Sequence, residues 1–300
     1  MKRPIVLALN PSMDAEWHVD GVRWEEKNNI TSEHRWPGGK GVNVARWLTH
    51  LGTKPLILLP LGGATGRELA QGLAAEGIAA RVISIAEETR VNVIVTTRQQ
   101  GQLRFNPPGP KISRREGQRI LSALRAELPR ARCLILSGSL PRGLPPTTYA
   151  ALIKLANRRN VPVFLDCDGE ALAHAAKARP FLLKPNEAEL VSWAKSVGLE
   201  PGRSEKEIRR LALQLARVTQ RWVLVSRGSK AAWLVHGKHH HALRAKPPRV
   251  KPLTTVGAGD ALLAAVIASV FRADDFPEWL QKGLATGAVA TQLPSGTLPK

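Results

Sequence analysis

The sequence predicts an α/β protein in which helices cover a mostly parallel β-sheet. The chain has 300 residues, of which 43% are hydrophobic, enough for one large α/β domain, alone or with a small appendage. Short runs rich in Leu and β-branched residues recur between helical stretches, which is the pattern of parallel strands joined by crossover helices. No segment approaches the roughly 20 uninterrupted apolar residues that a membrane helix needs.

The expected strands and helices alternate along most of the chain. The apolar runs predict strands at residues 5–9, 56–61, 133–137, 161–166, 181–184 and 222–226. The expected helices are residues 42–51, 66–76, 114–127, 147–159, 187–196, 205–219 and 258–271, with a last one near 277–293. In residues 205–219, the side chains of Ile208, Leu211, Leu215 and Val218 keep the spacing of one helix face.

Two segments interrupt this alternation and predict a second, smaller sheet. Residues 17–36 are polar and aromatic without a helical period, and residues 91–97 and 103–106 are typical of a hairpin closed around Gln99-Gln100-Gly101. Because loops at the carboxyl ends of strands build the ligand site of an α/β fold, a small sheet there would cover that site. We therefore expect one domain, residues 1–300, with a lid formed by about residues 11–37 and 88–108.

The chain is strongly basic, with 44 Lys and Arg residues against 24 Asp and Glu residues and a formal net charge of +20. A basic protein prefers anionic partners. The cations are dispersed over the solvent faces of the expected helices, however, and only one Tyr and five Phe residues are available to stack on bases. No nucleic-acid-binding motif is visible. We interpret the charge as a solvated surface and expect neither a nucleic acid nor a membrane as partner.

The start of the chain and its cysteines predict a reduced, cytoplasmic protein. The opening MKRPIVLALNP turns polar too soon for a secretory signal. Cys133 and Cys167 each lie in an apolar run, where free thiols behave as small buried hydrophobes. The triplet His239-His240-His241 is expected in an exposed strand or turn, since three neighbouring side chains of a strand cannot all face one metal ion.

The strongest chemical signal is the turn TTVGAGD at residues 254–260, which leads directly into the apolar segment 261–271. A helix that is apolar all round must be buried. Small residues at its start leave backbone N–H groups free to face a ligand, and the helix N-terminus adds a partial positive charge suited to phosphate. Asp260 then lies beside an anion site, unless its carboxylate only complements the helix dipole.

This turn resembles the second signature of the PfkB, or ribokinase-like, family of carbohydrate kinases. The first signature is present as PGGKGVNVAR at residues 37–46 and closes at Leu51-Gly52. A Gly-Gly-x-Gly turn before a helix is weak evidence by itself. Two such signatures in the right order and context are strong evidence together.

The resemblance covers essentially the whole chain and points to the branch that phosphorylates sugar phosphates. NPSMD at residues 10–14 resembles the family's opening, and TRVN at 89–92 and NPPGP at 106–110 resemble the segments that flank the lid. SGSLPRG at 137–143 and GEAL at 169–172 are similar to motifs of the phosphosugar branch. KPNEAEL at 184–190 is similar to the family's KPNxxEL, and VSRG at 225–228 to a turn beside the nucleotide, with Arg227 where Leu is commoner.

The resemblance implies a ribokinase-like three-layer α/β/α domain with a mostly parallel central sheet and a small β-sheet lid. It implies that Asp260 is the catalytic base and that Gly257, Ala258 and Gly259 form an anion hole. The residues implied for the sugar are Asp14, Gly38, Gly39 and Asn43. Those implied for ATP are Lys184, Asn186, Ser226 and Gly228, together with Gly257 and Gly259. Asn186 and Glu189 would place Mg²⁺, partly through water, although Asn-x-x-Glu is equally a helix capping box.

A phosphate on the substrate requires fixed cations. The candidates are Lys27, Lys40 and Arg90, with Ser139 as a hydroxyl donor. Arg90 is the first choice because it lies at the base of the expected lid and its guanidinium can bind a phosphate through two hydrogen bonds. Lys27 is equally explained as a surface lysine beside the acidic pair at residues 25–26.

Lys40 gives the first signature its GGKG form, which resembles 1-phosphofructokinases and tagatose-6-phosphate kinases. We therefore expect ATP-dependent phosphorylation of fructose 1-phosphate to fructose 1,6-bisphosphate. Tagatose-6-phosphate kinase and 6-phosphofructokinase activities are the alternatives, and a non-catalytic regulator that binds sugar phosphate or nucleotide is a further one. Lid sheets in this family often pair between subunits, so we also expect a homodimer through the lid.

Overall fold

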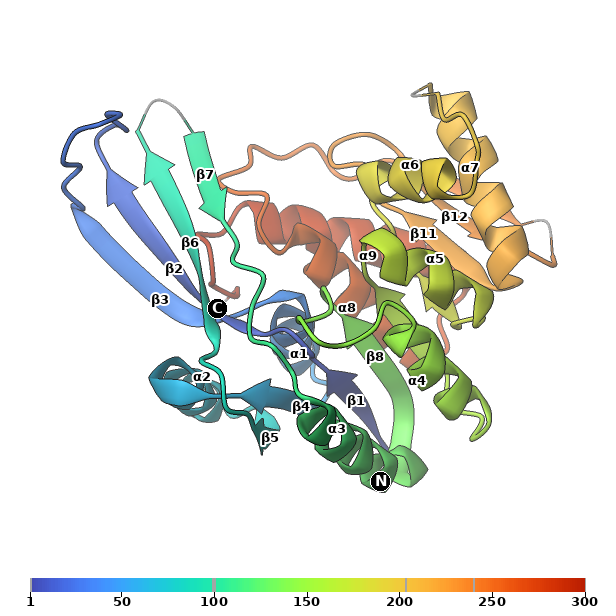
Figure 1. The fold of residues 1–300 in the computed structure, drawn as a ribbon. Coiled ribbons are helices and arrows are strands. Elements are labelled where there is room, and N and C mark those ends of the chain that lie inside the picture. Colours follow the sequence, from blue (N-terminus) through green and yellow to red (C-terminus); the bar gives the residue numbers. More distant parts are fainter. Residues whose placement is uncertain (1, 99–100, 203, 240, 300) are drawn as a thin grey trace.

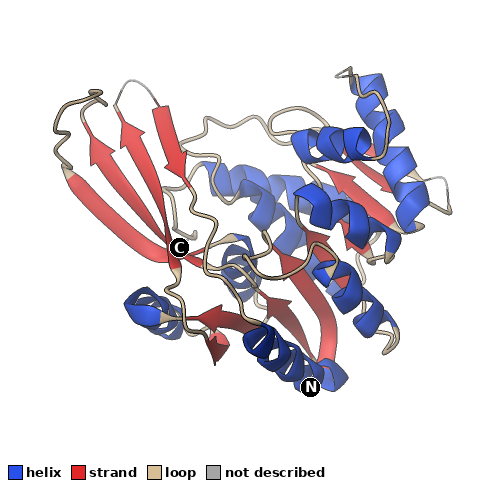
Figure 2. Ribbon diagram, viewed as in Figure 1, coloured by secondary structure: helices blue, strands red, loops and turns tan. Residues whose placement is uncertain are grey.

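The computed structural model describes residues 2–98, 101–202, 204–239 and 241–299, and these form two sheets of unequal size (Figure 1). Within these residues the larger sheet has nine strands and the smaller sheet has four. Helices surround the larger sheet, whereas the smaller sheet stands to one side of it (Figure 2). The predicted α/β architecture is confirmed.

The larger sheet is parallel except at one edge. Neighbouring strands are parallel from β5 to β11, and the last two strands are antiparallel. In spatial order the strands are β5 (Ala79–Ser84), β4 (Leu56–Leu61), β1 (Arg3–Leu7), β8 (Ala131–Ser137), β9 (Val163–Asp166), β10 (Leu182–Leu183), β11 (Trp222–Val225), β12 (Ala232–His236) and β13 (Ala242–Ala245). The sequence did not predict β5, β12 or β13.

Helices cover both faces of this sheet, so the fold has three layers (Figure 1). One face packs against α3 (Arg114–Glu127), α4 (Thr148–Asn157), α5 (Gly169–Lys177), α6 (Glu187–Ser196) and α7 (Glu205–Thr219), with the short 3₁₀ turn η1 (Leu128–Arg130) after α3. The other face packs against α1 (Lys40–His50), α2 (Gly63–Ala75), α8 (Ala258–Phe271) and α9 (Phe276–Thr291). The sequence did not predict α5.

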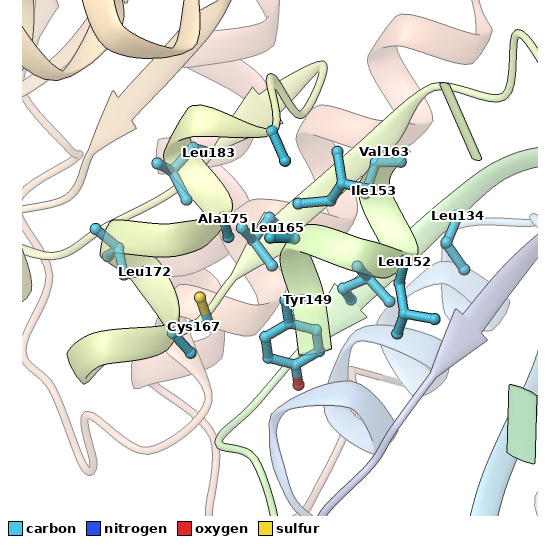
Figure 3. Close-up of a cluster of buried hydrophobic side chains, with 14 of the residues drawn as sticks. Leu134, Tyr149, Leu152, Ile153, Val163, Leu165, Cys167, Leu172, Ala175 and Leu183 are labelled. Atoms are coloured by element: carbon cyan, nitrogen blue, oxygen red, sulfur yellow. The ribbon is translucent and has the colours of Figure 1, made fainter. Parts of the chain in front are cut away.

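The core follows the two-residue period of the central strands. In β1, Ile5 and Leu7 enter one apolar cluster, whereas Val6 enters the cluster on the opposite face. Figure 3 shows part of the first cluster, in which Tyr149 and Cys167 lie among aliphatic side chains of α4, α5 and the strands. The Tyr149 hydroxyl donates to the Gly138 carbonyl at 2.9 Å, which anchors the loop after β8.

Both cysteines are buried free thiols, as predicted. Burial raises the pKa of Cys133 and of Cys167 above the ordinary value for a thiol. A thiol held in its protonated form is a poor nucleophile, so neither residue has the character of a reactive cysteine.

The smaller sheet has the order β3 (Ser32–Gly38), β2 (Ser12–Val19), β6 (Arg90–Thr97) and β7 (Gly101–Phe105). The central pair β2 and β6 is parallel, and the two outer pairs are antiparallel. The expected hairpin is the β6–β7 pair, although Gln99 and Gln100 lie outside the described residues. At the base of the sheet, Ser12 pairs with both Gly38 and Arg90, which brings the first glycine turn beside the start of β6.

The ends of several helices are set by side chains of their first turn. Ser113 begins α3 through a capping box with Glu116, and Ser204 caps α7. The apolar helix α8 is buried between the sheet and α9, as predicted from its composition. Among the described residues no helix is long and apolar enough to cross a membrane.

The histidine segment lies in the turn between β12 and β13. His239 belongs to the turn and His241 immediately precedes β13, while His240 lies outside the described residues. In the described part of the chain, no group of three His, Cys, Asp or Glu side chains could hold a metal ion. His239 and His241 are exposed, which agrees with the expectation of an exposed turn.

Candidate active site

The two glycine turns of the sequence meet at the carboxyl edge of the parallel strands. Asn43 in the first turn of α1 donates through Nδ2 to Oδ2 of Asp260 at 2.8 Å. Asp260 lies in the first turn of α8 and is only 5% exposed. The helices that follow the two signatures therefore start side by side, and the carboxylate points toward the first signature.

The surroundings of Asp260 favour its protonated form. Burial is the largest cause, the nearby carboxylate of Asp166 is the second, and together they raise the pKa of Asp260 to about 7. The hydrogen bond from Asn43 and the charges of Lys40 and Lys184 oppose this rise. A carboxyl group with a pKa near neutrality can accept a proton and release it again at the pH of a cell.

A group of four charges, of which Asp166 and Lys184 are buried and Lys40 and Glu189 are half-buried, lies next to Asp260. Oδ2 of Asp166 accepts from Lys184 Nζ at 2.8 Å, and Oδ1 accepts from Lys40 Nζ at 3.0 Å. Lys40 also contacts Oε1 of Glu189 at 3.3 Å. Burial by itself would raise the pKa of Asp166, but the two ammonium groups outweigh it and hold that pKa below its usual range. Asp166 therefore stays ionised beside Asp260.

The start of α8 offers free backbone donors. Gly257 precedes the helix in the left-handed region, with φ of 76°, and no side chain caps this end. The Asp260 amide already donates to the Gly257 carbonyl at 3.1 Å. Among the described residues, no acceptor bonds the amides of Gly257, Ala258 and Gly259. Three unpaired N–H groups at a helix N-terminus form a site suited to an anion.

Asn186 and Glu189 form a complete capping box at the start of α6. The Asn186 side chain accepts from the Glu189 amide at 2.8 Å, and Oε2 of Glu189 accepts from the Asn186 amide at 2.8 Å. Each carboxylate oxygen of Glu189 has one donor and keeps a free lone pair. The pair therefore fits a magnesium ion held through water, but it does not form a cage of direct ligands.

The turn after β11 lies beside this capping box. Ser226 donates its amide to Pro185 at 3.1 Å and accepts from the Glu187 amide at 3.0 Å. Gly228 has a φ of 58°, and a Cβ built on it would meet no atom within 4 Å. Arg227 is buried and donates to Glu187 Oε2 at 2.8 Å, so this residue adds no unpaired charge to the turn.

Asp14 lies on β2, near the base of the smaller sheet. Its Oδ1 accepts from Ser12 Oγ at 2.7 Å and from Asn92 Nδ2 at 2.9 Å. Burial raises the pKa of Asp14, and these two hydrogen bonds oppose the rise. A Cβ on Gly38 would lie 2.2 Å from the Asp14 carboxyl carbon, so only glycine fits there, and the Gly39 amide also contacts this carboxylate.

Arg90 and Ser139 are brought together by Asn10. Arg90 donates to the Asn10 carbonyl at 2.9 Å and to the Pro107 carbonyl at 2.8 Å, and the Asn10 side chain donates to Ser139 Oγ at 3.0 Å. Arg90 Nε and Asn10 Oδ1 are buried without a hydrogen-bond partner among the described residues. A buried guanidinium with an unused donor is a suitable partner for a phosphate or carboxylate.

Two of the expected phosphate-binding cations lie elsewhere. Lys40 is held by Asp166 and Glu189, at the Asp260 end of the site. Lys27 lies in the exposed loop that joins β2 to β3 at the far end of the smaller sheet, whereas Arg90 lies at its base (Figure 1). Within one chain the structure does not bring Lys27 to Arg90 and Ser139.

The sequence-based site omitted Asp166 and Asn10. Asp166 ends a predicted strand, and an acidic residue at the carboxyl end of a parallel strand is a signal for a ligand site. Asn10 had a similar signal, because it follows the first strand within a motif that was already noted. Several of their partners, however, lie far away along the chain: Lys40 is 126 residues from Asp166, and Ser139 is 129 residues from Asn10.

Comparison with protein families decides the class of this site. Residues 10–300 match the pfkB family of carbohydrate kinases. The chain belongs to this family. Carbohydrate kinases of the family use ATP and typically a divalent metal, so the protein is assigned as an ATP-dependent sugar kinase.

Solved structures of phosphofructokinase-2 from Escherichia coli are similar over nearly the full length of this pfkB family member. One, in complex with potassium, is 31% identical with a TM-score of 0.90, and the match covers 98% of this chain and 94% of that chain. Another, in complex with fructose 6-phosphate, is 30% identical with a TM-score of 0.88, and the match covers 97% of this chain and 94% of that chain.

More distant structures show the same fold. A possible 1-phosphofructokinase from Thermotoga maritima has a TM-score of 0.87 at 23% identity, with 99% of this chain and 94% of that chain covered. Ribokinase from the same organism has a TM-score of 0.78 at 19% identity, with 98% and 94% covered. The ribokinase-like fold expected from the sequence is confirmed.

Proposed function

We propose that this sugar kinase converts a fructose monophosphate to fructose 1,6-bisphosphate, with Asp260 as general base. The observation that carries this proposal is the position of Asp260. Its buried carboxyl group, with a pKa raised to about 7, lies in the same turn as the three free amides at the start of α8. A proton acceptor and an anion site next to each other are what in-line phosphoryl transfer requires.

In the proposed reaction the acceptor hydroxyl of the sugar gives its proton to Asp260 while its oxygen attacks the γ-phosphorus of ATP. The bond between that phosphorus and the bridging oxygen breaks, and ADP leaves. The amides of Gly257, Ala258 and Gly259 donate to the equatorial oxygens of the transferred group. Asn43 orients the carboxylate through its hydrogen bond of 2.8 Å.

The nucleotide side is assigned to the region around the two capping-box residues. Ser226 and Gly228 would line this region. Lys184 contacts Asp166 and Lys40 contacts Glu189, so two positive charges lie beside the proposed ATP site. When bound, Mg²⁺ would neutralise charge on the ATP phosphates, and Asn186 and Glu189 would hold it through water. Lys40 would then balance the negative charge at this end of the site.

The substrate phosphate is assigned to Arg90 and Ser139. This assignment is supported by the unpartnered Nε of Arg90 and by the Asn10 bridge that fixes both groups. On the other side of the sugar, Asp14, the backbone of Gly38 and Gly39, and Asn43 would bind hydroxyls.

Fructose 1-phosphate remains the first substrate of this proposal, because the GGKG form of the first signature resembles that of 1-phosphofructokinases. Fructose 6-phosphate is the second candidate, because the 30% identical phosphofructokinase-2 has been solved in complex with it. The preference rests on the resemblance of this motif and not on a contact of Lys40 with the substrate phosphate, since its ammonium group is held by Asp166 and Glu189. Both substrates lead to the same bisphosphate.

The smaller sheet is proposed as the lid and as a dimer surface. Its strands and loops expose several large apolar side chains, namely Trp24, Ile30, Leu103 and Phe105. Trp24 is 82% exposed, and contiguous exposed apolar groups mark interaction surfaces. Pairing of two such sheets would cover these side chains.

A coupled assay of ADP release tests the proposed function. Fructose 1-phosphate, fructose 6-phosphate, tagatose 6-phosphate and ribose are compared at equal concentrations against a blank without sugar. We expect kcat/KM for a fructose monophosphate to exceed that for ribose at least tenfold, because ribose has no phosphate to accept from Nε of Arg90. Ribose turnover equal to that of the best fructose phosphate would identify a kinase of unphosphorylated sugars. Nucleotide binding without any turnover would identify a regulator.

A further inference from the structure

The parallel sheet collects basic residues that are scattered along the sequence. Six neighbouring strands, in the order β11, β10, β9, β8, β1 and β4, are all parallel, so all six begin at the same edge. This amino edge lies opposite the carboxyl edge that holds Asp260 and Asp166. At this edge Arg3, the first residue of β1, pairs with Ala131, the first residue of β8, which directly follows η1.

The short segment before each of these strands contains at least one Lys or Arg residue. The short segments that lead into them are residue 2 and residues 51–55, 128–130, 158–162, 178–181 and 220–221, and none contains an Asp or Glu. Their basic residues are Lys2, Lys54, Arg130, Arg158, Arg159, Arg179 and Arg221, and we call this set the basic edge. Adjacent strands are about 4.8 Å apart, so the row extends over about 24 Å.

Contacts between neighbouring segments fix part of this row. The side chain of Asn157, the last residue of α4, donates to the carbonyls of Ala178 at 3.0 Å and Arg179 at 3.3 Å. This contact joins the segment before β9 to the segment before β10. The backbone segments that carry the cations before β9 and β10 are therefore fixed relative to each other.

The cations of the basic edge lack counter-charges. In the described part of the chain, no ion pair engages Lys54, Arg130, Arg158, Arg159, Arg179 or Arg221, and their side chains donate no hydrogen bond. All six residues are solvent-exposed. One carboxylate near this edge, Glu127, already binds Arg81 at 2.9 Å and Arg3 at 3.9 Å. Helix C-termini at this edge each supply only about half a negative charge. A net positive row remains.

We propose that the basic edge binds the phosphate backbone of double-stranded DNA without reading its sequence. A row of about 24 Å matches about seven base pairs at 3.4 Å each, and the phosphates supply the missing counter-charges. The segments of the basic edge carry none of the large exposed aromatic side chains that stack on single-stranded bases, nor the apolar anchors that enter a bilayer. This inference does not depend on the proposed sugar substrate.

Fluorescence anisotropy of a labelled 24-base-pair duplex of random sequence tests the proposal. We expect the wild-type chain to bind at 150 mM salt with a Kd of about 1–100 µM, typical of non-specific binding. The triple variant Arg130→Gln, Arg158→Gln, Arg159→Gln should bind at least tenfold more weakly. The slope of log K against log salt should become shallower by about 2.7, since each lost phosphate contact contributes about 0.9.

A matched control separates this edge from the overall charge. The variant Arg114→Gln, Arg115→Gln, Lys206→Gln removes the same charge from the exposed first turns of α3 and α7, near the carboxyl edge. We expect it to lose less than threefold in affinity, and both variants to keep their far-UV circular dichroism and nucleotide binding. Equal losses in the two variants would overturn the proposal, because only net charge would then matter. Absence of duplex binding at 150 mM salt, or binding confined to phosphatidylserine vesicles, would also overturn it.

Discussion

At the scale of single residues, two buried carboxylates of the site behave in opposite ways. Asp166 has two ammonium partners and keeps a pKa below the usual range, whereas Asp260 has an amide partner and a negative neighbour and its pKa rises to about 7. Pairs of acidic groups whose surroundings separate their pKa values have separate roles in catalysis. Asp166 stays a fixed charge, and Asp260 is free to exchange a proton.

The pH dependence of turnover follows from the raised pKa of Asp260. A general base must be ionised, so kcat/KM should rise with pH and level off above an apparent pKa near 7. Asp260→Asn should lower kcat by at least about 100-fold while nucleotide binding persists. Initial rates between pH 5 and 9 measure both effects. A flat profile in the wild type, or near-normal turnover of the variant, would remove Asp260 from this role.

A stability measurement provides a control that does not rely on activity. The folded-state pKa of Asp260 lies above the ordinary value of 3.8, so the stability linked to its proton is present below pH 4 and is lost as the pH rises through about 7. Relative to Asp260→Asn, the wild type should therefore lose free energy of unfolding over this pH range. Urea titrations of both proteins at several pH values give the comparison.

At the scale of elements, the turn between β3 and α1 fixes the backbone around Asp14, on the side of the site that we propose for the sugar. Gly38 ends β3 against the Asp14 carboxylate, and Gly39 turns the chain with a φ of 90° so that α1 begins at Lys40. A left-handed residue without a side chain is the least strained way to make this turn. The first glycine signature thus fits Gly38 against Asp14 and brings Asn43 to Asp260.

Gly38→Ala tests this arrangement. The added methyl group would lie 2.2 Å from the Asp14 carboxyl carbon and must displace that side chain. We expect kcat/KM for the sugar to fall at least tenfold, with less than a threefold change in the KM for ATP, because the nucleotide side lies on other elements. Gly21→Ala is the matched control, since a Cβ there meets no atom within 4 Å. Unchanged sugar kinetics in Gly38→Ala would place sugar recognition away from Asp14.

The elements differ in how far the sequence predicted them. The bounds of α3, α6, α7 and α8 agree with the expected ranges, because a capping residue or glycine turn precedes a clear apolar period. The strand β5 was missed because it is an edge strand with mostly exposed side chains, and α5 because it has only nine residues. Short elements gain most of their stability from tertiary packing, which local patterns do not report.

The residues of the site were predicted more completely than their contacts. Motifs located Asp260, Asn43 and Lys40, since each lies within a few residues of a glycine turn. The ion pair of Lys40 with Asp166 spans 126 residues and depends on which strands are neighbours. Strand order follows from packing of the whole sheet, so the sequence pattern left Lys40 among the sugar-phosphate cations.

At the scale of the whole molecule, the smaller sheet is linked to the rest of the chain through Glu16. This buried side chain lies on β2, and its Oε1 accepts from Thr96 at 2.6 Å, Gln102 at 3.2 Å and Ser295 at 3.3 Å. The Gln102 side chain in turn accepts from Thr254 at 3.3 Å, just before the second glycine turn. One carboxylate therefore connects the smaller sheet with the C-terminal segment and, through Gln102, with the second glycine turn.

Removal of this carboxylate should destabilise the fold. Glu16→Ala leaves three donors without their acceptor, and we expect the free energy of unfolding to fall by about 1–3 kcal/mol. Glu33→Ala on β3 is the control, because that carboxylate is 44% exposed and its change should stay within about 0.5 kcal/mol. Equilibrium urea unfolding compares the two variants. A loss in Glu16→Ala no larger than in the control would show that the link is dispensable.

The basic edge and the site around Asp260 lie at opposite edges of the sheet, which matters when the protein is attached to a surface. All six strands point from the basic edge toward the cleft that holds Asp260, so a chain attached through those cations presents its cleft to the surrounding solution. Adsorption through the basic edge would place the carboxyl edge of the sheet away from a negatively charged support. In protein attached in this way, the site around Asp260 would stay accessible to small substrates. Random attachment would cover that site in some of the molecules.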